Sequence, residues 1–298
     1  MGHQKSIIRQ AIERLDSFRG IGESRRDAKR AMREASGERL WTISTGKIHS
    51  HTTRRVYQQQ VLAFINWARE VHGVSRLECL DARADELATA YLQLHMDEGK
   101  SAYTLQTERS ALRLFFQAKT LAQTLALPRR SRTTITRSRG VAAHDRHLQA
   151  ANWQPLIRLL SATGLRRNEV RLLLVGDIVA CETDPDYAEQ ITVRVRNGKG
   201  GKSRTVPVLA GHEQDVLCLA QGRQADEFVF SIIPKHLDVH SYRRAYAQSL
   251  YLALAPGRSL PPSTDRLKRG DYDAEAVLKV SQALGHRRRE VVLHHYLR

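Results

Sequence analysis

Several residues that could bind or transfer phosphate occur as short motifs in the second half of the chain. In residues 162–170, Ala-Thr-Gly-Leu-Arg-Arg-Asn-Glu-Val, a helix is predicted to stop at Gly164, so that Arg166 begins the next helix. Backbone N–H groups and a guanidinium can then face the same anion. His240 and Arg243 lie three positions apart on one helix face, which suits joint contact with one phosphate. Taken singly, each motif also fits an ordinary helix junction or an exposed polar turn.

A glycine-rich segment at residues 196–203 looks like a nucleotide-binding phosphate loop, but its spacing and context exclude one. A Walker loop requires glycine at the position of Arg196 and must lead from a strand into a helix. The residues that follow, 204–208, are largely β-branched and predict a second strand. The segment is therefore predicted to be a β-hairpin whose tip carries Lys199 and Lys202.

The charge of the sequence indicates a polyanionic partner. The 298 residues include 48 Lys and Arg against 31 Asp and Glu, a formal net charge of +17 at pH 7. The basic excess recurs along the chain, so nucleic acid is favoured over a membrane surface, which would need one concentrated amphipathic basic stretch. With 41% hydrophobic residues, the chain can form two domains with their own cores. No apolar run is suited to a signal peptide or a transmembrane helix.

The cysteine and histidine patterns favour neither a disulfide framework nor a metal centre. Cys79, Cys181 and Cys218 are odd in number and widely spaced, and we expect them to be buried thiols in a reducing cytoplasm. The histidines at 49–51 and 286–295 lack an accompanying carboxylate or cysteine at ligand spacing. We therefore expect no metal and no other cofactor.

The first half of the chain is predicted to be helical. Residues 1–49 are interpreted as an N-terminal arm with accessory helices, and residues 50–128 as an all-helical DNA-binding domain. Arg109 is one of the basic residues on the polar helix faces of that domain. Apolar residues at helical spacing predict helices at 8–18, 52–73, 87–99 and 105–116.

A basic linker is predicted at residues 129–146. The segment breaks the helical periodicity and combines hydroxyl, glycine and arginine residues, so it can lie along DNA phosphates, with Arg129, Arg130 and Arg137 as candidate contacts. Residues 147–298 are predicted to form a mixed, mostly helical second domain with a small antiparallel sheet. Its predicted helices lie at 153–162, 168–174, 239–253 and 274–284, and its strands at 191–196, 205–208 and 228–231.

The ordered set Thr-Gly-Leu-Arg, Gly-Lys-Gly-Gly-Lys, His-x-x-Arg, Leu-Gly-His and a late tyrosine resembles the tyrosine recombinase (phage integrase) family. The resemblance covers residues 147–298 and, more weakly, the helical domain. It implies a fold that is mainly α with a small antiparallel β-sheet, consisting of an all-helical core-binding domain and a mixed α/β catalytic domain. The implied activity is site-specific DNA recombination or integration for a mobile genetic element, through a 3′-phosphotyrosyl intermediate.

The resemblance also implies a role for each residue that matches a family motif. Lys202 would contact the sugar-phosphate backbone of the DNA. The implied active-site residues are Arg166 and Arg243 as clamps of the scissile phosphate, Lys199 as proton donor, His240 and His286 around the nucleophile Tyr296, and Glu169 as support for the first arginine.

These roles agree with the chemistry of phosphoryl transfer. Two guanidiniums can bind the charge that gathers on the nonbridging oxygens and stay protonated at any working pH, so no metal is required. A phenol with a pKa near 10 is a poor nucleophile until a base such as His240 activates it. Because the phosphotyrosine linkage retains the bond energy, rejoining needs no ATP.

The expected partners are double-stranded DNA target sites, three further copies of the chain in a synaptic homotetramer, and accessory DNA-bending proteins. The free protein is expected to be a cytoplasmic monomer that associates with the nucleoid on DNA, without a membrane contact. Tyr296 lies ten positions after His286, one more than is usual in the family, and two residues follow it. A catalytically impaired DNA-binding protein acting as regulator or accessory factor, and a topoisomerase-like nicking and closing enzyme, are therefore retained as alternatives.

Overall fold

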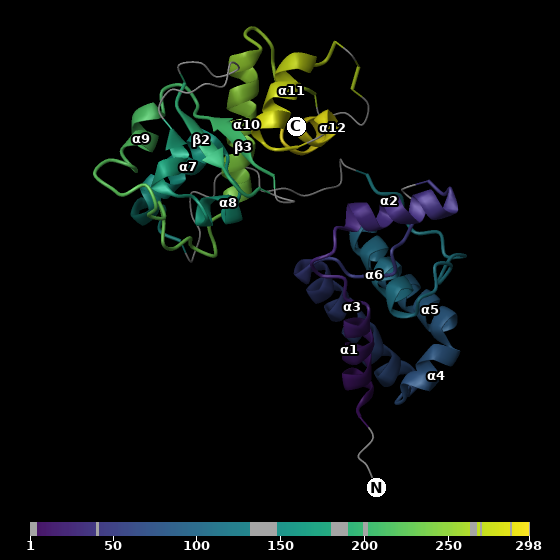
Figure 1. Cartoon of the computed structure of the whole chain (residues 1–298). Helices are drawn as coiled ribbons and strands as arrows, with labels where there is room; N and C mark the ends of the chain where they lie inside the picture. Colours follow the sequence, from purple (N-terminus) through teal and green to yellow (C-terminus); the bar gives the residue numbers. More distant parts are fainter. Residues whose placement is uncertain are drawn as a thin grey trace. The chain divides into compact units, whose positions relative to one another are not determined.

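The computed structural model describes residues 5–39, 42–131, 148–179, 190–198, 202–262, 267–268, 270–286 and 288–297. The chain divides into two compact units, Met1–Arg130 and Ser131–Arg298 (Figure 1). Helices predominate in the described residues, and the strands among them form a three-stranded antiparallel sheet in the second unit. The predicted fold class, mainly α with a small antiparallel β-sheet, is confirmed. The finer predicted domain limits stay predictions.

Side-chain caps and a terminating glycine define the limits of two helices of the first unit. Ser50 accepts a hydrogen bond from the N–H of Thr53 at the start of α3, and Ser101 accepts one from Thr104 at the start of α6. Gly73 ends α3 at a φ of +65°, a conformation that favours glycine. The helices of this unit are α1 (Ile7–Ser17), α2 (Arg25–Ser36), α3 (His51–His72), α4 (Leu77–Ala82), α5 (Ala84–Asp97) and α6 (Ala102–Phe115).

α3 is the centre of the first unit's core. Its buried apolar residues recur at three- and four-residue spacing, and it packs against α6, α1 and α5. α1, which the sequence analysis assigned to the N-terminal arm, contributes a buried stripe to the same core, whereas α2 buries no residue. The buried residues are Val61, Phe64, Ile65 and Ala68 on α3, and Ile7, Ala11 and Leu15 on α1.

The second unit packs helices around the small sheet. Strand order is β1-β2-β3, and β2 pairs antiparallel with β3 so that Val195 lies opposite Arg204, as the predicted hairpin requires. Residues 199–201, including Lys199, lie outside the described residues. The elements are η1 (Ala150–Trp153), α7 (Gln154–Thr163), α8 (Arg167–Arg171), η2 (Val175–Asp177), β1 (Ile178–Val179), β2 (Thr192–Val195), β3 (Arg204–Pro207), α9 (Glu213–Leu217), α10 (Val239–Leu254), α11 (Ala274–Ala283) and α12 (Arg289–His295).

The strand predicted at residues 228–231 is wrong. Phe228 forms only an isolated bridge with Leu174. The guanidinium of Arg223 donates to the main-chain oxygens of Phe228 and Val229, at 2.7 and 3.2 Å. These oxygens are therefore occupied by a side chain instead of a longer strand ladder.

The turn between α7 and α8 fits closely against α10. Gly164 has a φ of +58°, and a Cβ atom placed there would lie 2.5 Å from the ring of Tyr246. Tyr246 is fully buried and donates its hydroxyl hydrogen bond to Pro207 O at 2.8 Å. Glycine is required at position 164 both for backbone conformation and for space, and this fixes the approach to Arg166.

Two cysteines differ from the sequence expectation, because Cys79 and Cys218 are exposed rather than buried. Cys79 lies on the outer face of α4, whose Leu77 and Leu80 take the buried positions. Cys218 follows α9 and accepts a hydrogen bond from Gln214 Nε2 at its Sγ. Residue 181, the third cysteine, lies outside the described residues.

Candidate active site

Arg166 stands at the junction between α7 and α8. Its backbone N–H donates to Oε2 of Glu169 at 2.8 Å, which satisfies a free donor at the start of α8. Its guanidinium donates to Oε1 of the same carboxylate at 2.7 Å. Glu169 therefore holds both the backbone and the side chain of Arg166.

Arg204 is a second arginine on the same carboxylate, and sequence reasoning missed it. Its Nη1 and Nη2 donate to the two oxygens of Glu169 at 2.9 and 2.8 Å. Burial by itself raises the pKa of Glu169, but the hydrogen bonds and charges of Arg204 and then Arg166 outweigh it and lower the pKa to about 2. The carboxylate stays ionised and can hold both guanidiniums across the physiological pH range.

The C-terminal end of α11 collects the arginines. Ala283 O accepts from Arg204 Nε at 2.8 Å, and Leu284 O accepts from Arg166 Nη2 at 3.1 Å. Carbonyl groups in the last turn of a helix have no intrahelical partner and carry partial negative charge, so they attract cations. One helix end therefore positions side chains that come from β3 and from the start of α8.

Arg243 is the most buried charge of the site. It lies on α10 with 0% of its surface exposed, and its guanidinium donates to Gly164 O and to Leu284 O. Burial lowers the pKa of Arg243 to about 10, so the side chain remains protonated at neutral pH. Its Nε lies 3.4 Å from the hydroxyl oxygen of Tyr296.

Tyr296 follows α12, and His286 lies beside it. The two ring centroids are 5.4 Å apart, and His286 Nε2 lies 3.3 Å from Arg166 Nη2. The main chain of His286 is held by Ser281, whose backbone oxygen accepts from His286 N and whose hydroxyl donates to His286 O. Although the spacing from His286 to Tyr296 is one residue longer than usual in the family, the phenol still reaches Arg243.

His240 lies in the first turn of α10, where the carboxylate of Asp238 accepts its backbone N–H. Its pKa is lowered by burial and then by the charge of Arg243, with a smaller contribution from Arg166. The imidazole is therefore neutral at physiological pH, as a general base must be.

The predicted active-site residues that the structure describes are brought together in the second unit. They are Arg166, Glu169, His240, Arg243, His286 and Tyr296. Chemically, the site combines a phenol, two imidazoles and an excess of buried guanidinium, which suits an anion at the phenol oxygen. Across the described part of the chain, no group of three or more His, Cys, Asp or Glu side chains is arranged to hold a metal ion.

Residues 38–123, which include α3 to α6, match the family model of the phage integrase N-terminal SAM-like domain. We refer to this segment as the SAM-like domain, after the family model that it matches. The match confirms the resemblance to the phage integrase family. No protein with a curated description matches the sequence.

Solved structures similar to this chain include recombinases and integrases. The Tn1549 transposon integrase in complex with transposon right end DNA has 13% identity and a TM-score of 0.48, over 91% of this chain and 94% of that chain. The same integrase with a circular intermediate DNA has 12% identity and a TM-score of 0.44, with the same two coverages. XerA recombinase has 16% identity and a TM-score of 0.29, over 97% of this chain and 93% of that chain.

The predicted DNA contacts outside the active site are dispersed. Lys202 is exposed just before β3, at the loop end of the hairpin, and its main-chain oxygen accepts from Gly198 N. Arg129 and Arg130 are exposed just after the SAM-like domain, and Arg130 lies 5.3 Å from the ring centroid of Tyr103. Residue 137 lies outside the described residues.

Arg109, by contrast, is engaged within the SAM-like domain. Its guanidinium donates to Leu125 O at 3.2 Å and to Ala122 O at 3.5 Å. Burial and then the nearby charge of Arg113 lower the pKa of Arg109. These contacts tie the loop after α6 to its helix and leave fewer donors for a phosphate.

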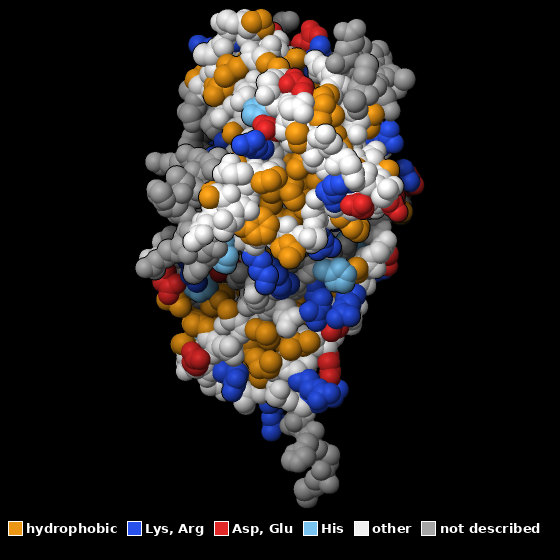
Figure 2. Space-filling model, turned by 90° about the vertical axis from the view of Figure 1, so that its left-hand side faces the viewer, with side chains coloured by type: hydrophobic (Ala, Val, Ile, Leu, Met, Phe, Trp, Pro, Cys, Tyr) orange, Lys and Arg blue, Asp and Glu red, His pale blue; other side chains and the backbone are white. Residues whose placement is uncertain are grey.

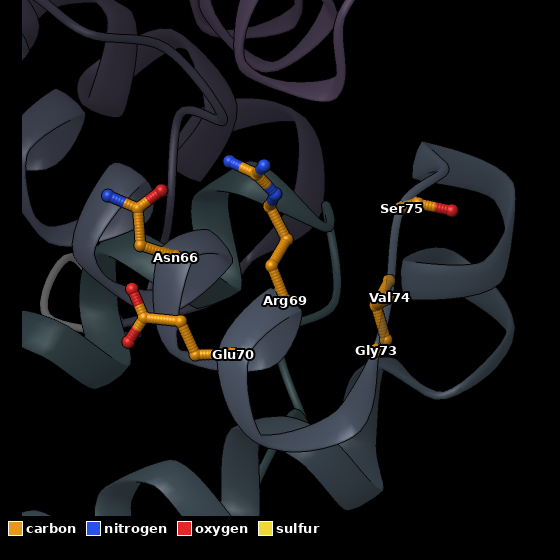
Figure 3. Close-up of a pocket in the computed structure, with 6 residues that line it drawn as sticks. All are labelled: Asn66, Arg69, Glu70, Gly73, Val74 and Ser75. Atoms are coloured by element: carbon orange, nitrogen blue, oxygen red, sulfur yellow. The ribbon is translucent and has the colours of Figure 1, made fainter.

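A separate pocket of about 350 Å³ lies at the C-terminal end of α3 in the SAM-like domain. Figure 3 shows Asn66, Arg69 and Glu70 on the last turns of α3, and Gly73, Val74 and Ser75 on the segment that follows. None of the predicted site residues lines this pocket. Within the described residues, no helix is both long and apolar enough to span a membrane.

Proposed function

We propose that this protein is a site-specific DNA recombinase that cleaves and rejoins DNA strands through a covalent bond between Tyr296 and a DNA 3′-phosphate. The observation that supports it best is the position of the Arg243 Nε atom, 3.4 Å from the phenol oxygen of Tyr296. A fully buried guanidinium at a nucleophile is favourable where an anion joins them. The SAM-like domain supports the same conclusion, because its family is that of phage integrases.

In the proposed reaction, Arg166 and Arg243 bind the nonbridging oxygens of the scissile phosphate. The Tyr296 oxygen forms a bond to phosphorus, and its proton passes to His240. The bond from phosphorus to the 5′-oxygen breaks, and the leaving oxygen takes a proton from Lys199. His286 contacts the same phosphate beside Arg166.

Glu169 and Arg204 act as positioning residues in this proposal. The carboxylate holds Arg166, and Arg204 joins that carboxylate to β3 and to the end of α11. These contacts hold three chain segments in fixed positions relative to one another: the start of α8 with Arg166, the hairpin strand β3, and the end of α11, which precedes His286. Positional errors of about an ångström are costly in such a site.

Strand joining reverses these steps, with a free 5′-hydroxyl attacking the phosphotyrosine. Because the linkage conserves the energy of the phosphodiester, the proposal includes neither ATP nor a metal cofactor. The proposed partners are double-stranded target sites, further copies of the chain in a homotetramer, and accessory DNA-bending proteins. Figure 2 shows Lys and Arg side chains distributed over the face in view, in keeping with the net charge of +17.

The deciding experiment traps the covalent intermediate. The protein is incubated with a DNA library and denatured in detergent, and DNA that remains attached to protein is recovered and sequenced. We expect an adduct on Tyr296, located by mass spectrometry, that is absent from Tyr296→Phe. DNA binding without any adduct would contradict the proposal and favour the impaired DNA-binding alternative. An adduct with relaxation of supercoiled plasmid but without recombinants would favour a nicking and closing enzyme.

A further inference from the structure

α2 is a basic helix that the fold of the first unit does not use. Its sequence, Arg-Arg-Asp-Ala-Lys-Arg-Ala-Met-Arg-Glu-Ala-Ser, contains five Lys or Arg residues and two carboxylates, and no residue of the helix is buried. It precedes residue 38, where the match to the SAM-like domain begins. Neither core packing nor the family model therefore accounts for it.

α2 lies within a loop, residues 20–47, whose two ends are joined by contacts between residues 18–19 and residue 48. Arg19 and Ile48 form a β-bridge, and Ile48 N donates to Phe18 O at 2.7 Å. Lys47 Nζ pairs with the carboxylate of Glu23 at 2.9 Å. The chain leaves the core before α2 and returns to the same point after it, so the core of the first unit does not depend on the helix between.

The basic residues of α2 lie next to one another on the helix surface, so their positive charges repel. Arg25, Lys29 and Arg33 succeed each other at four-residue spacing, as do Arg26 and Arg30, so like charges face each other along one side. Burial and then the charge of Arg25 lower the pKa of Lys29. Such a pattern destabilises an isolated helix, and a bound polyanion removes the repulsion.

The carboxylates of α2 do not neutralise this side. Asp27 and Glu34 both lie near Arg30, at 3.4 and 4.0 Å, in exposed pairs. Within the described residues, no ion pair involves Arg26 or Arg33. The helix nevertheless has a complete N-cap at Ser24 and a left-handed C-cap at Gly37, so its sequence specifies a helix that presents cations.

We propose that α2 is a DNA-binding helix that contacts phosphates of the backbone outside the candidate active site. The nine residues from Arg25 to Arg33 span about 12 Å along the helix axis, which corresponds to the axial rise of roughly three phosphates on one strand. The choice of DNA as partner rests on the proposed function, and charge complementarity selects phosphates rather than base edges.

The test compares two triple variants of the full chain. The first is Arg26→Gln, Arg30→Gln and Arg33→Gln, which keeps helix propensity because Gln and Arg form helices about equally well. The control is Arg9→Gln, Arg69→Gln and Arg76→Gln, three exposed arginines of the same unit. Arg69 lies in the last turn of α3 and Arg76 is the N-cap residue of α4, and α4 lies at the end of the first unit opposite α2 (Figure 1). Both variants lose the same charge, so only position differs.

Binding to a fluorescent duplex of arbitrary sequence is measured by anisotropy over a range of salt concentrations. For the α2 variant we expect the slope of log K against log salt to fall by about 2 to 3, and affinity to fall roughly tenfold to hundredfold. The control variant should retain most of the slope. Equal losses in both variants, or a loss in neither, would overturn the inference, and so would self-association through α2 with unchanged DNA binding.

The covalent trapping assay, run on the same proteins, separates this inference from the proposed function. An adduct on Tyr296, together with DNA binding that is unchanged in the α2 variant, would contradict the inference about α2 but not the proposed function. DNA binding that depends on α2 without any adduct would end the proposed recombinase activity and leave the inference standing. Thermal unfolding of both variants checks that the first unit remains folded.

Discussion

Both units bury ionisable side chains, but the two clusters differ in how many acidic partners the basic groups have. In the first unit, Nδ1 of His95 lies 3.0 Å from Oε2 of Glu108, and both side chains are buried. In the second unit, Arg166 and Arg204 bind the one buried carboxylate of the cluster, Glu169, and these two arginines and Arg243 donate to three main-chain oxygens. The first cluster is complete, whereas the second has positive charge in excess.

The excess positive charge of the arginine cluster destabilises the fold but favours binding of an anion. Helix-end carbonyls satisfy the donors of Arg243 but bring no full negative charge, so its desolvation is only partly offset. A phosphate at the Tyr296 oxygen would supply the missing charge. This difference supports the proposed phosphate-binding role of the arginine cluster, whereas the pair in the first unit has a partner for each side chain.

The largest expected effect tests the fork geometry of Arg243. In Arg243→Lys the charge remains, but one ammonium cannot replace the donors to Gly164 O, Leu284 O and the phosphate. We expect adduct formation on the recovered cleavage site to slow by about a thousandfold. The neighbouring Arg244→Lys is the control and should leave the rate nearly unchanged. A normal rate in Arg243→Lys would show that point charge alone suffices.

The next effect concerns stability and pH at Glu169. Its folded-state pKa of about 2 lies below the unfolded value of about 4.3, so its stabilisation is complete above the unfolded value and is lost as pH falls toward 2. Glu169→Gln should cost on the order of 3 kcal/mol at neutral pH, and the difference from wild type should shrink below about pH 4. Urea unfolding at several pH values measures it, with exposed Glu275→Gln as control. A pH-independent difference would contradict the assignment.

In the first unit, breaking the balanced pair should change stability without changing the chemistry. Glu108→Ala leaves His95 buried without its partner and should destabilise the protein by roughly 3 kcal/mol. The double variant His95→Leu with Glu108→Leu should recover much of this loss. Adduct formation per folded molecule should equal wild type in both. A selective fall in that rate would break the separation between the two clusters.

The fold was largely predictable because its signals are local. Apolar periodicity defines α3, α6 and α10 within a few residues of the predicted limits, and side-chain caps from Ser50, Ser101 and Asp238 fix where these helices begin. The strand expected at 228–231 failed because the guanidinium of Arg223, five and six positions before Phe228 and Val229, takes their carbonyl oxygens. The strand pattern itself does not show that a nearby side chain competes for these oxygens.

The candidate site was predictable where motifs carry it and not where tertiary contacts do. Arg166, Arg243 and Tyr296 stand in recognisable short motifs, whereas Arg204 looks like an ordinary charged residue at the start of a strand. One signal was present in the sequence. Arg204 lies two positions before the buried Val206, and residues two apart in a strand point to the same face, so Arg204 points to the buried face of β3. Its carboxylate partner, thirty-five positions away, could not be read from that alternation.

The smallest effect sharpens the electrostatic side of the comparison at His240. Burial and then Arg243 lower the pKa of this imidazole, and Arg244 adds a minor contribution in the same direction. A general base must be neutral, so the rate of adduct formation should be level near pH 7 and fall in acid, with a midpoint below the ordinary value of about 6.5.

Arg244→Gln should move that midpoint upward by a small amount, because one cation no longer opposes protonation, and His240→Asn should remove the acid limb and slow the reaction by about a hundredfold. The measurement is the pH dependence of the adduct rate with saturating DNA. An acid limb that persists in His240→Asn would assign the base to another group. If the acid limb depends on His240 but its midpoint does not change in Arg244→Gln, the bound phosphate already screens the charge of Arg244. The phosphate would then neutralise the excess positive charge by which the arginine cluster differs from the pair in the first unit.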